Sequence, residues 1–167
     1  MSKTSLNNVT AEVVIPEGGA NGVVLVQGGA FGGWVVYFKD GHLKYCYNLL
    51  SIHRYYAESA DPVSPGEHQV RMEFAYDGGG ITKGGDVILY VDGQPVGTGR
   101  VDRTMPFIFS ADDGMDVGTD TGLRVTDDEP KGQFTGEVRW VQLDLGIEEN
   151  DHLLTPEDRY RAAMMRQ

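Results

Sequence analysis

The sequence is poor in cysteine and basic residues, and it has no long hydrophobic run. Cys46 is the single cysteine among 167 residues, so the chain cannot close an internal disulfide, and a domain of this size does not need one. No apolar stretch approaches the roughly 18 residues of a membrane span, and the N-terminal MSKTSLNNVT lacks the apolar segment of a signal peptide. These absences predict a soluble domain and leave its compartment open, the cytoplasm being slightly favoured.

Acidic residues outnumber basic ones, 25 against 14, which gives a formal net charge of −11. Proteins that bind nucleic acid or anionic lipid do so through basic residues that displace counterions from phosphates. A surface with this charge repels such partners. We therefore expect neither nucleic acid nor a membrane to bind this chain.

Alternating apolar and polar residues, as over residues 67–76, indicate half-buried strands. The dipeptides Asp40-Gly41 and Asp92-Gly93 each lie between two such runs, which is a strong signal for a two-residue hairpin turn. Further strands are predicted at residues 8–15, 22–28, 52–58 and 134–145, with a short one near 106–110. Many short strands without a long helical pattern predict an all-β fold, an antiparallel β-sandwich over residues 1–147.

Two features near the C-terminus depart from this pattern. The apolar residues of 134–145 change face near Trp140, which predicts either a bulge there or a strand covered on both faces. Residues 148–167 are interpreted as a polar linker and a short C-terminal helix at about 156–166. Thr155-Pro156 suits the N-cap and the first position of that helix.

The glycine-rich stretch at residues 77–93 raises the question of a phosphate-binding loop. A Walker-type loop needs a lysine followed by serine or threonine at the start of a helix. Lys83 is instead followed by Gly84 and then by a strand pattern. The stretch is therefore interpreted as the connection of a hairpin.

No residue pattern identifies a catalytic centre. The four histidines lack the spacing of a zinc site and are interpreted as solvated residues; they are His42, His53, His68 and His152. Cys46, between two tyrosines of a predicted strand, is interpreted as a packed side chain. Glu73, Asp86 and Glu137 are interpreted as solubility charges on outward strand faces. We predict no catalytic residue and no cofactor, with calcium as the one candidate that the sequence leaves open.

The calcium candidate is the acidic loop at residues 110–122. Its four carboxylates, Asp112, Asp113, Asp116 and Asp120, are the oxygen ligands that calcium prefers, but their spacing is not that of an EF-hand. Aspartate and glycine are also what a tight exposed turn requires. The sequence leaves both interpretations open.

Six aromatic residues lie close together in the sequence and allow two interpretations, a sugar-stacking platform or a packed core. They are Trp34, Tyr37, Tyr45, Tyr47, Tyr55 and Tyr56. Alternation puts Trp34 on the same strand face as Val36 and Phe38, which favours packing.

The order of these blocks resembles the C-terminal region of large bacterial arylsulfatases. Residues 10–48, 70–122 and the closing FTGEVRWVQLDL carry the similarity, which covers about residues 8–145, and the tail HLLTPEDRYRAAMMRQ is similar to an extension found in some of those enzymes. The hairpin GGWVVYFKDGHLKYCYN and the closing strand are also similar to concanavalin A-like and laminin-G-like jelly rolls. The resemblance thus implies the same sandwich that alternation predicts.

The resemblance implies a piece of a sulfatase without its catalytic half. In that family a formylglycine nucleophile arises from a [CS]-x-P-x-R motif, and Cys46 is followed by Tyr-Asn-Leu-Leu, while no serine completes the motif. The chain is therefore expected to be a non-catalytic accessory domain whose partner is a sulfatase catalytic domain, in the same chain or separate, with homo-oligomer assembly a further expectation. The alternative is a carbohydrate- or calcium-dependent ligand-binding module.

Overall fold

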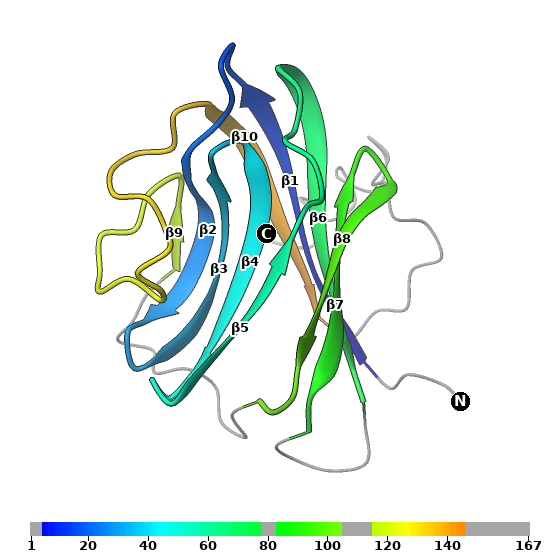
Figure 1. The fold of residues 1–167 in the computed structure, drawn as a ribbon, viewed down its shortest axis with the longest axis vertical. Coiled ribbons are helices and arrows are strands. Elements are labelled where there is room, and N and C mark those ends of the chain that lie inside the picture. The colour runs from blue at the N-terminus through cyan, green and yellow to red at the C-terminus, as the bar shows by residue number, and fades with distance from the viewer. Residues whose placement is uncertain (1–4, 78–82, 105–114, 146–167) are drawn as a thin grey trace, which may run out of the picture.

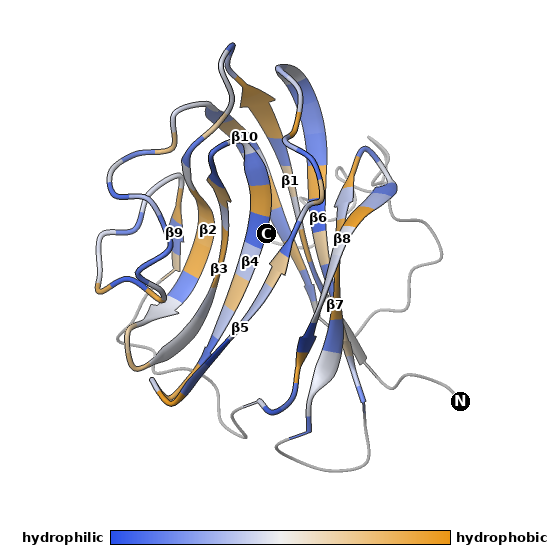
Figure 2. Cartoon of the chain, in the orientation of Figure 1, coloured by the Kyte–Doolittle hydropathy of each residue, from blue (hydrophilic) through white to orange (hydrophobic). Residues whose placement is uncertain are grey.

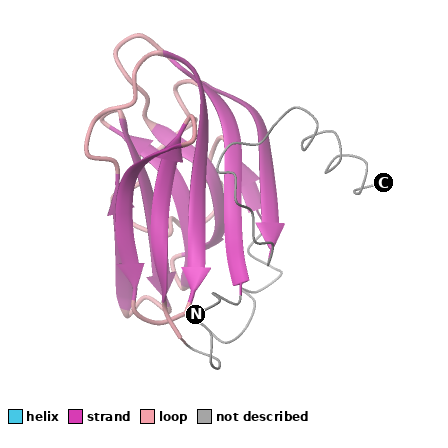
Figure 3. Cartoon of the chain, turned by 90° about the vertical axis from the view of Figure 1, so that its right-hand side faces the viewer, coloured by secondary structure: helices cyan, strands magenta, loops and turns pink. Residues whose placement is uncertain are grey.

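Two antiparallel sheets face each other in the computed structural model, which describes residues 5–77, 83–104 and 115–145 (Figure 1). The strands of the described part are β1 (Ser5–Ile15), β2 (Gly22–Gly29), β3 (Gly32–Lys39), β4 (His42–Leu49), β5 (His53–Glu58), β6 (Gly66–Tyr76), β7 (Gly85–Val91), β8 (Gln94–Val101), β9 (Met115–Val117) and β10 (Glu137–Leu145). Sheet A has the order β10-β1-β6-β7-β8, and sheet B has the order β5-β4-β3-β2-β9. The described residues form only strands and loops (Figure 3), so the predicted all-β sandwich is confirmed.

The hairpin turns lie where the sequence predicts them. Asp40-Gly41 joins β3 to β4 and Asp92-Gly93 joins β7 to β8, with φ of 51° and 83° in the first turn and 51° and 81° in the second. Positive φ at both central residues is the type I′ geometry that matches the twist of the flanking strands. The glycine-rich segment joins β6 to β7 as a hairpin in which Tyr76 pairs with Gly85, as predicted.

The main core fills the space between the two sheets. On β6, Val70, Met72 and Phe74 point inward, while Arg71 and Glu73 lie on the opposite face, as period-2 alternation requires. The other buried core residues are Val9, Ala11, Val13, Ile15, Ala20, Val24, Leu25, Val36, Phe38, Leu43, Tyr45, Tyr47, Ala57, Val63, Val87, Leu89, Val101 and Phe134. This arrangement leaves one outward face on each sheet for other roles.

Glycines let the two sheets close on each other at the β5–β8 edge. A Cβ placed on Gly97 would lie 2.2 Å from the carbonyl oxygen of Glu58, and one on Gly99 would lie 2.5 Å from that of Tyr56. The Ala60 amide also donates a hydrogen bond to the Val96 carbonyl across this edge, at 2.9 Å. Only glycine permits so close a backbone approach at these two positions.

The closing strand contains the predicted irregularity. Glu12 of β1 pairs with Trp140, whereas Val13 pairs with Val138, so Arg139 is an extra residue on β10. This bulge reverses the strand face on which apolar residues lie, which explains the change of phase in the sequence. The structure also contains β9, a three-residue strand paired with β2 that alternation does not predict.

Several expectations fall outside the described residues. These are the strand near 106–110, the polar linker and the helix of residues 148–167. The boundary of the sandwich at residue 147 likewise stays a prediction. Within the described ranges, no helix has the length and apolarity that crossing a membrane requires.

Candidate functional site

The connection from β9 to β10 lies over the outer face of sheet B (yellow in Figure 1). We call residues 118–133 the covering loop. Its start is fixed by a hydrogen bond from the Gly118 amide to the Val24 carbonyl, at 2.9 Å. Val125 then enters a second apolar cluster on that face; its other members are Val23, Val26, Val35, Tyr37 and Cys46. Because this cluster is completely buried, the covering loop packs against the sheet along its middle.

Asp128 fastens the same loop to two strands. Its carboxylate accepts a hydrogen bond from the Tyr37 hydroxyl at 2.5 Å and one from the Lys39 ammonium at 2.6 Å, and it also accepts one from Lys44. Burial would raise the pKa of Asp128, but the three donors outweigh that effect and hold the pKa far below its ordinary value. Asp128 is therefore ionised and is the polar anchor of the loop.

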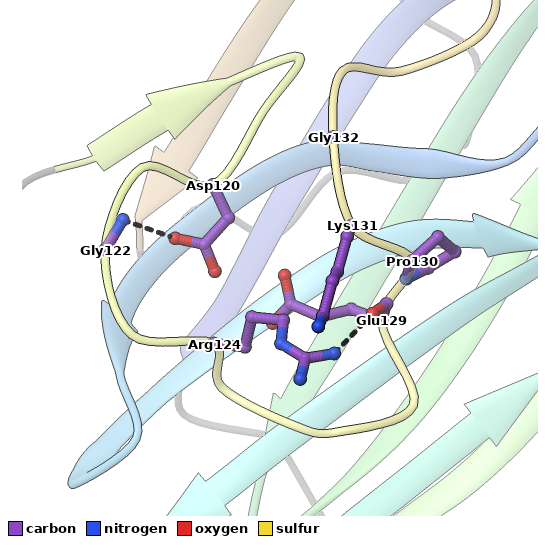
Figure 4. Close-up of a pocket in the computed structure, with 7 residues that line it drawn as sticks. All are labelled: Asp120, Gly122, Arg124, Glu129, Pro130, Lys131 and Gly132. Carbon is purple, nitrogen blue, oxygen red and sulfur yellow. Dashed lines mark hydrogen bonds between the residues drawn. The ribbon is translucent and has the colours of Figure 1, made fainter.

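The covering loop encloses a pocket of about 210 Å³ (Figure 4). The residues that line it are Asp120, Gly122, Arg124, Glu129, Pro130, Lys131 and Gly132. Glu129 is only 1% exposed, and its Oε1 accepts a hydrogen bond from the Val125 amide at 2.8 Å. Asp120 Oδ1 accepts one from the Gly122 amide at 3.1 Å. The two carboxylates point toward each other across the pocket (Figure 4).

The second oxygen of each of these carboxylates is buried without a hydrogen-bond donor. These atoms are Asp120 Oδ2 and Glu129 Oε2. Burial raises the pKa of Glu129, and the Asp120 carboxylate raises it further, to about 8, because it would accept a hydrogen bond from the protonated acid and repels the ionised one. The pocket therefore concentrates acceptor oxygens that need a proton or a positive charge.

The structure tests the predicted calcium loop only in part. Asp112 and Asp113 lie outside the described residues. Asp116 Oδ2 accepts hydrogen bonds from the amide and the hydroxyl of Thr121, at 2.9 and 2.8 Å, so Asp116 serves to shape the loop. Among the described residues, no three His, Cys, Asp or Glu side chains group as metal ligands. Asp120 instead faces Glu129, which sequence reasoning missed because Glu129 stands in an ordinary run of charged residues.

A second feature lies where three loops meet at one end of sheet B. Phe31, Leu50, Ile52 and Leu123 expose 74%, 49%, 68% and 64% of their surface, respectively, and we call them the apolar tip. Figure 2 shows hydrophobic colour at the turns between β2 and β3 and between β4 and β5 at this end. Exposed apolar side chains grouped on loops are typical of an interaction surface.

The loops of the apolar tip are tied together by Asn48. Its side-chain amide donates to the Ala30 carbonyl at 3.0 Å and to the Val125 carbonyl at 2.9 Å. The Ser51 hydroxyl also donates to the Ala30 carbonyl. The β2–β3 turn, the β4–β5 turn and the covering loop therefore hold fixed positions relative to one another.

The β4–β5 turn has positive φ without a glycine, unlike the Asp-Gly turns of β3–β4 and β7–β8. Leu50 and Ser51 have φ of 51° and 63°, a region that glycine and asparagine favour and that costs a leucine about 1–2 kcal/mol. The Ile52 amide closes the turn on the Leu49 carbonyl at 2.8 Å. The turn thus presents Leu50 and Ile52 to solvent at a cost in stability, which is typical of a functional site.

The outward face of sheet A corrects one sequence interpretation. Glu73 is only 6% exposed, so it is no solubility charge; Asp86 and Glu137 are exposed as predicted. Glu73 accepts a hydrogen bond at 2.9 Å from Arg71, which also donates to the Thr10 hydroxyl. Glu73 is buried because Arg71, only 2% exposed, lies beside it as a charged partner.

Other candidate residues are mostly packed. Cys46 is fully buried, and burial raises the pKa of its thiol to about 12, as expected of a packed side chain.

Five of the six aromatic residues belong to or pack against the two cores: Trp34, Tyr37, Tyr45, Tyr47 and Tyr55. Tyr56 is 44% exposed and shares a hydrogen bond of 2.7 Å with the Thr126 hydroxyl. His42 and His68 are half-buried and hydrogen-bonded, so they are less solvated than predicted.

Comparison with known proteins defines the fold. No protein-family model matches the sequence, and no curated protein matches it. The LG1–3 region of the laminin α2 chain is a similar solved structure, with a TM-score of 0.59 and 16% identity over 91% of this chain and 30% of that one. Domains LG4–5 of the mouse laminin α1 chain have a TM-score of 0.49 and 16% identity over 85% of this chain and 39% of that one. A heptameric SAP-like pentraxin from Limulus polyphemus has a TM-score of 0.44 and 12% identity, over 84% of this chain and 64% of that one.

The similarity to laminin α2 shows that the chain has a laminin-G-like, concanavalin A-like sandwich, as the resemblance in the sequence implies. The chain spans about a third of that structure, and identity this low speaks for the fold and not for a function. These three structures show no link to a sulfatase, so that part of the resemblance stays a prediction.

Proposed function

We propose that this chain is a non-catalytic accessory module that docks onto another protein domain through the apolar tip. The observation that carries the proposal is the group of four exposed side chains on three mutually bonded loops. Burying one such side chain at an interface is worth about 1.5–3 kcal/mol. Since the loops are already held in place, docking costs little ordering entropy.

The chemistry of the apolar tip favours a protein surface over a sugar or a membrane. Sugars stack on flat aromatic rings, whereas three of the four side chains, Leu50, Ile52 and Leu123, are aliphatic. Anionic lipid is disfavoured by the net charge of −11. An apolar patch rimmed by polar residues is instead typical of a contact between folded domains.

The sequence resemblance supports a sulfatase catalytic domain as the partner. The missing [CS]-x-P-x-R motif and the buried Cys46, whose raised pKa keeps it a neutral thiol, support a role without catalysis. The isolated chain is accordingly expected to give no turnover on an aryl sulfate. Metal-dependent hydrolysis by the purified chain would overturn the non-catalytic proposal.

A binding experiment tests the docking. The chain is mixed with a separately expressed arylsulfatase catalytic domain and measured by size-exclusion chromatography with light scattering, which also reports self-association. We expect a stable complex that Ile52→Ser weakens about tenfold, because the polar side chain forfeits burial worth about 1.4 kcal/mol. Val117→Ser is the matched control, since Val117 is a β-branched residue 50% exposed on β9. Equal loss in both variants would contradict docking through the tip.

The alternative function is a carbohydrate- or calcium-dependent binding module. The facing carboxylates of Asp120 and Glu129 favour it. If the chain remains alone and monomeric with the catalytic domain, while a glycan panel yields a ligand, this alternative replaces the docking proposal.

A further inference from the structure

We propose that Asp120 and Glu129 form a binding site for a hard divalent cation, with calcium the best-suited ion, inside the pocket of the covering loop. The site is distinct from the apolar tip, and the inference does not rest on the docking function. It also differs from the calcium loop read from the sequence, because Glu129 was not among those residues and Asp116 bonds within its own loop.

The two carboxylates are held in place with one oxygen of each left without a donor. Each has one oxygen held by a backbone amide, from Val125 to Glu129 and from Gly122 to Asp120. These bonds orient the second oxygens, Glu129 Oε2 and Asp120 Oδ2, which are buried and lack a donor. Glu129 is 99% removed from solvent, so solvent does not compensate its oxygen in the way that it would on an open surface. Two carboxyl groups oriented in this way need either a proton or a cation between them.

The basic residues of the pocket do not satisfy these two oxygens. Arg124 donates to the carbonyl oxygens of Glu129 at 3.2 Å and Asp127 at 3.4 Å, and its Nη2 lies 3.7 Å from the Asp127 carboxylate. Lys131 is exposed at the pocket wall. Neither side chain donates to the two buried oxygens. The compensating proton or cation therefore has to come from solution.

The oxygen ligands and the size of the pocket determine which cation fits. Carboxylate oxygens favour calcium and magnesium, and the pocket of about 210 Å³ has room for a cation with its waters. Magnesium demands a near-ideal octahedron, whereas calcium accepts an irregular shell completed by water and carbonyl oxygens. With only two protein carboxylates and Lys131 and Arg124 nearby, we expect weak binding, with Kd on the order of 10⁻⁴ to 10⁻³ M.

Thermal melting and calorimetric titration of the full chain with CaCl2 test the proposal. At a calcium concentration about tenfold above Kd, binding to the folded state alone raises Tm by about 4 °C. Glu129→Gln should abolish this response. The glutamine oxygen still accepts the Val125 amide, and its amide can donate to Asp120, so the variant folds and melts above the metal-free wild type.

Matched controls separate a specific site from the general attraction of an acidic protein for cations. Glu17→Gln removes the same charge at an exposed position on the β1–β2 connection and should keep the full calcium response. Lys131→Gln should tighten calcium binding severalfold, because it removes a positive charge from the pocket wall. Sodium chloride at equal ionic strength screens the net charge of −11 in every variant and should therefore shift the Tm of the wild type and of Glu129→Gln equally. No calcium response in the wild type, or an equal response in Glu129→Gln, overturns the proposal and leaves a shared proton between the carboxylates.

Discussion

Removing the Asp128 carboxylate should release the covering loop from sheet B. In Asp128→Ala the Tyr37 hydroxyl, fully buried, loses the acceptor it bonds at 2.5 Å. Lys44, with 13% of its side chain exposed, loses its ion pair but keeps contacts with the rings of Tyr37 and Tyr56, at 5.7 and 6.0 Å from their centres. Lys39, 40% exposed, can return to solvent. The cost therefore falls mainly on Tyr37 and Lys44, whose side chains are largely buried.

The loss of these contacts determines how much the free energy of unfolding falls. A buried hydroxyl without a partner costs about 1–3 kcal/mol, and the exposed pair with Lys39 adds less than about 1 kcal/mol. We expect Asp128→Ala to lower the free energy of unfolding by about 2–3 kcal/mol. Asp127→Ala is the control, because its fully exposed side chain should change stability by less than about 0.5 kcal/mol.

Urea denaturation followed by tryptophan fluorescence and circular dichroism measures this difference. Combining Asp128→Ala with Tyr37→Phe should cost at least about 1 kcal/mol less than the sum of the single changes, since both remove the same hydrogen bond. Additive effects, or an Asp128→Ala protein as stable as the wild type, would refute the assignment of Asp128 as the anchor of the loop.

The hydrogen bonds of the Asp128 carboxylate also make the stability of the chain depend on pH. The pKa of Asp128 is lower in the folded chain than its ordinary value of 3.8. Its contribution is therefore complete above about pH 4 and is lost as the pH falls toward the folded-state pKa. Between pH 4 and pH 2 the wild type should lose stability more steeply than Asp128→Ala.

Three further predictions follow from the backbone and the core. Leu50→Asn should raise the free energy of unfolding by about 1 kcal/mol, because asparagine tolerates positive φ, while weakening any partner bound at the apolar tip; urea denaturation and the chromatographic assay report the two effects. Gly97→Ala should lower stability by at least about 2 kcal/mol, since its Cβ would meet the Glu58 carbonyl, whereas Thr98→Ala on the exposed face of the same strand should cost a few tenths. Cys46 should react with a thiol reagent only as fast as the chain unfolds, because burial raises its pKa to about 12; rapid labelling of the native protein would contradict its buried position.

The sandwich could be predicted because its signals are local. Alternation over residues 67–76 follows directly from side chains pointing to opposite faces, and Asp40-Gly41 and Asp92-Gly93 meet the positive φ of their turns without help from distant residues. The turn at Leu50-Ser51 carries no such signal. The Ser51 hydroxyl donates to the Ala30 carbonyl of the β2–β3 turn, a contact that exists only in the folded chain, and the nearby Asn48 side chain accepts a hydrogen bond from the Ser51 amide.

The sequence did not identify Glu129 as a site residue for a related reason. A loop rich in aspartate and glycine indicates exposure, and within this loop Asp127 is indeed exposed. The covering loop nevertheless packs against sheet B at two points, where Val125 enters an apolar cluster and Asp128 binds the strand lysines. Glu129 follows Asp128 directly, and its carboxylate turns back to the Val125 amide, so the two attachments bury it. The loop has two apolar residues, and the sequence does not tell that Val125 is buried while Leu123 is exposed, so the burial of Glu129 beside Val125 becomes visible only in the fold.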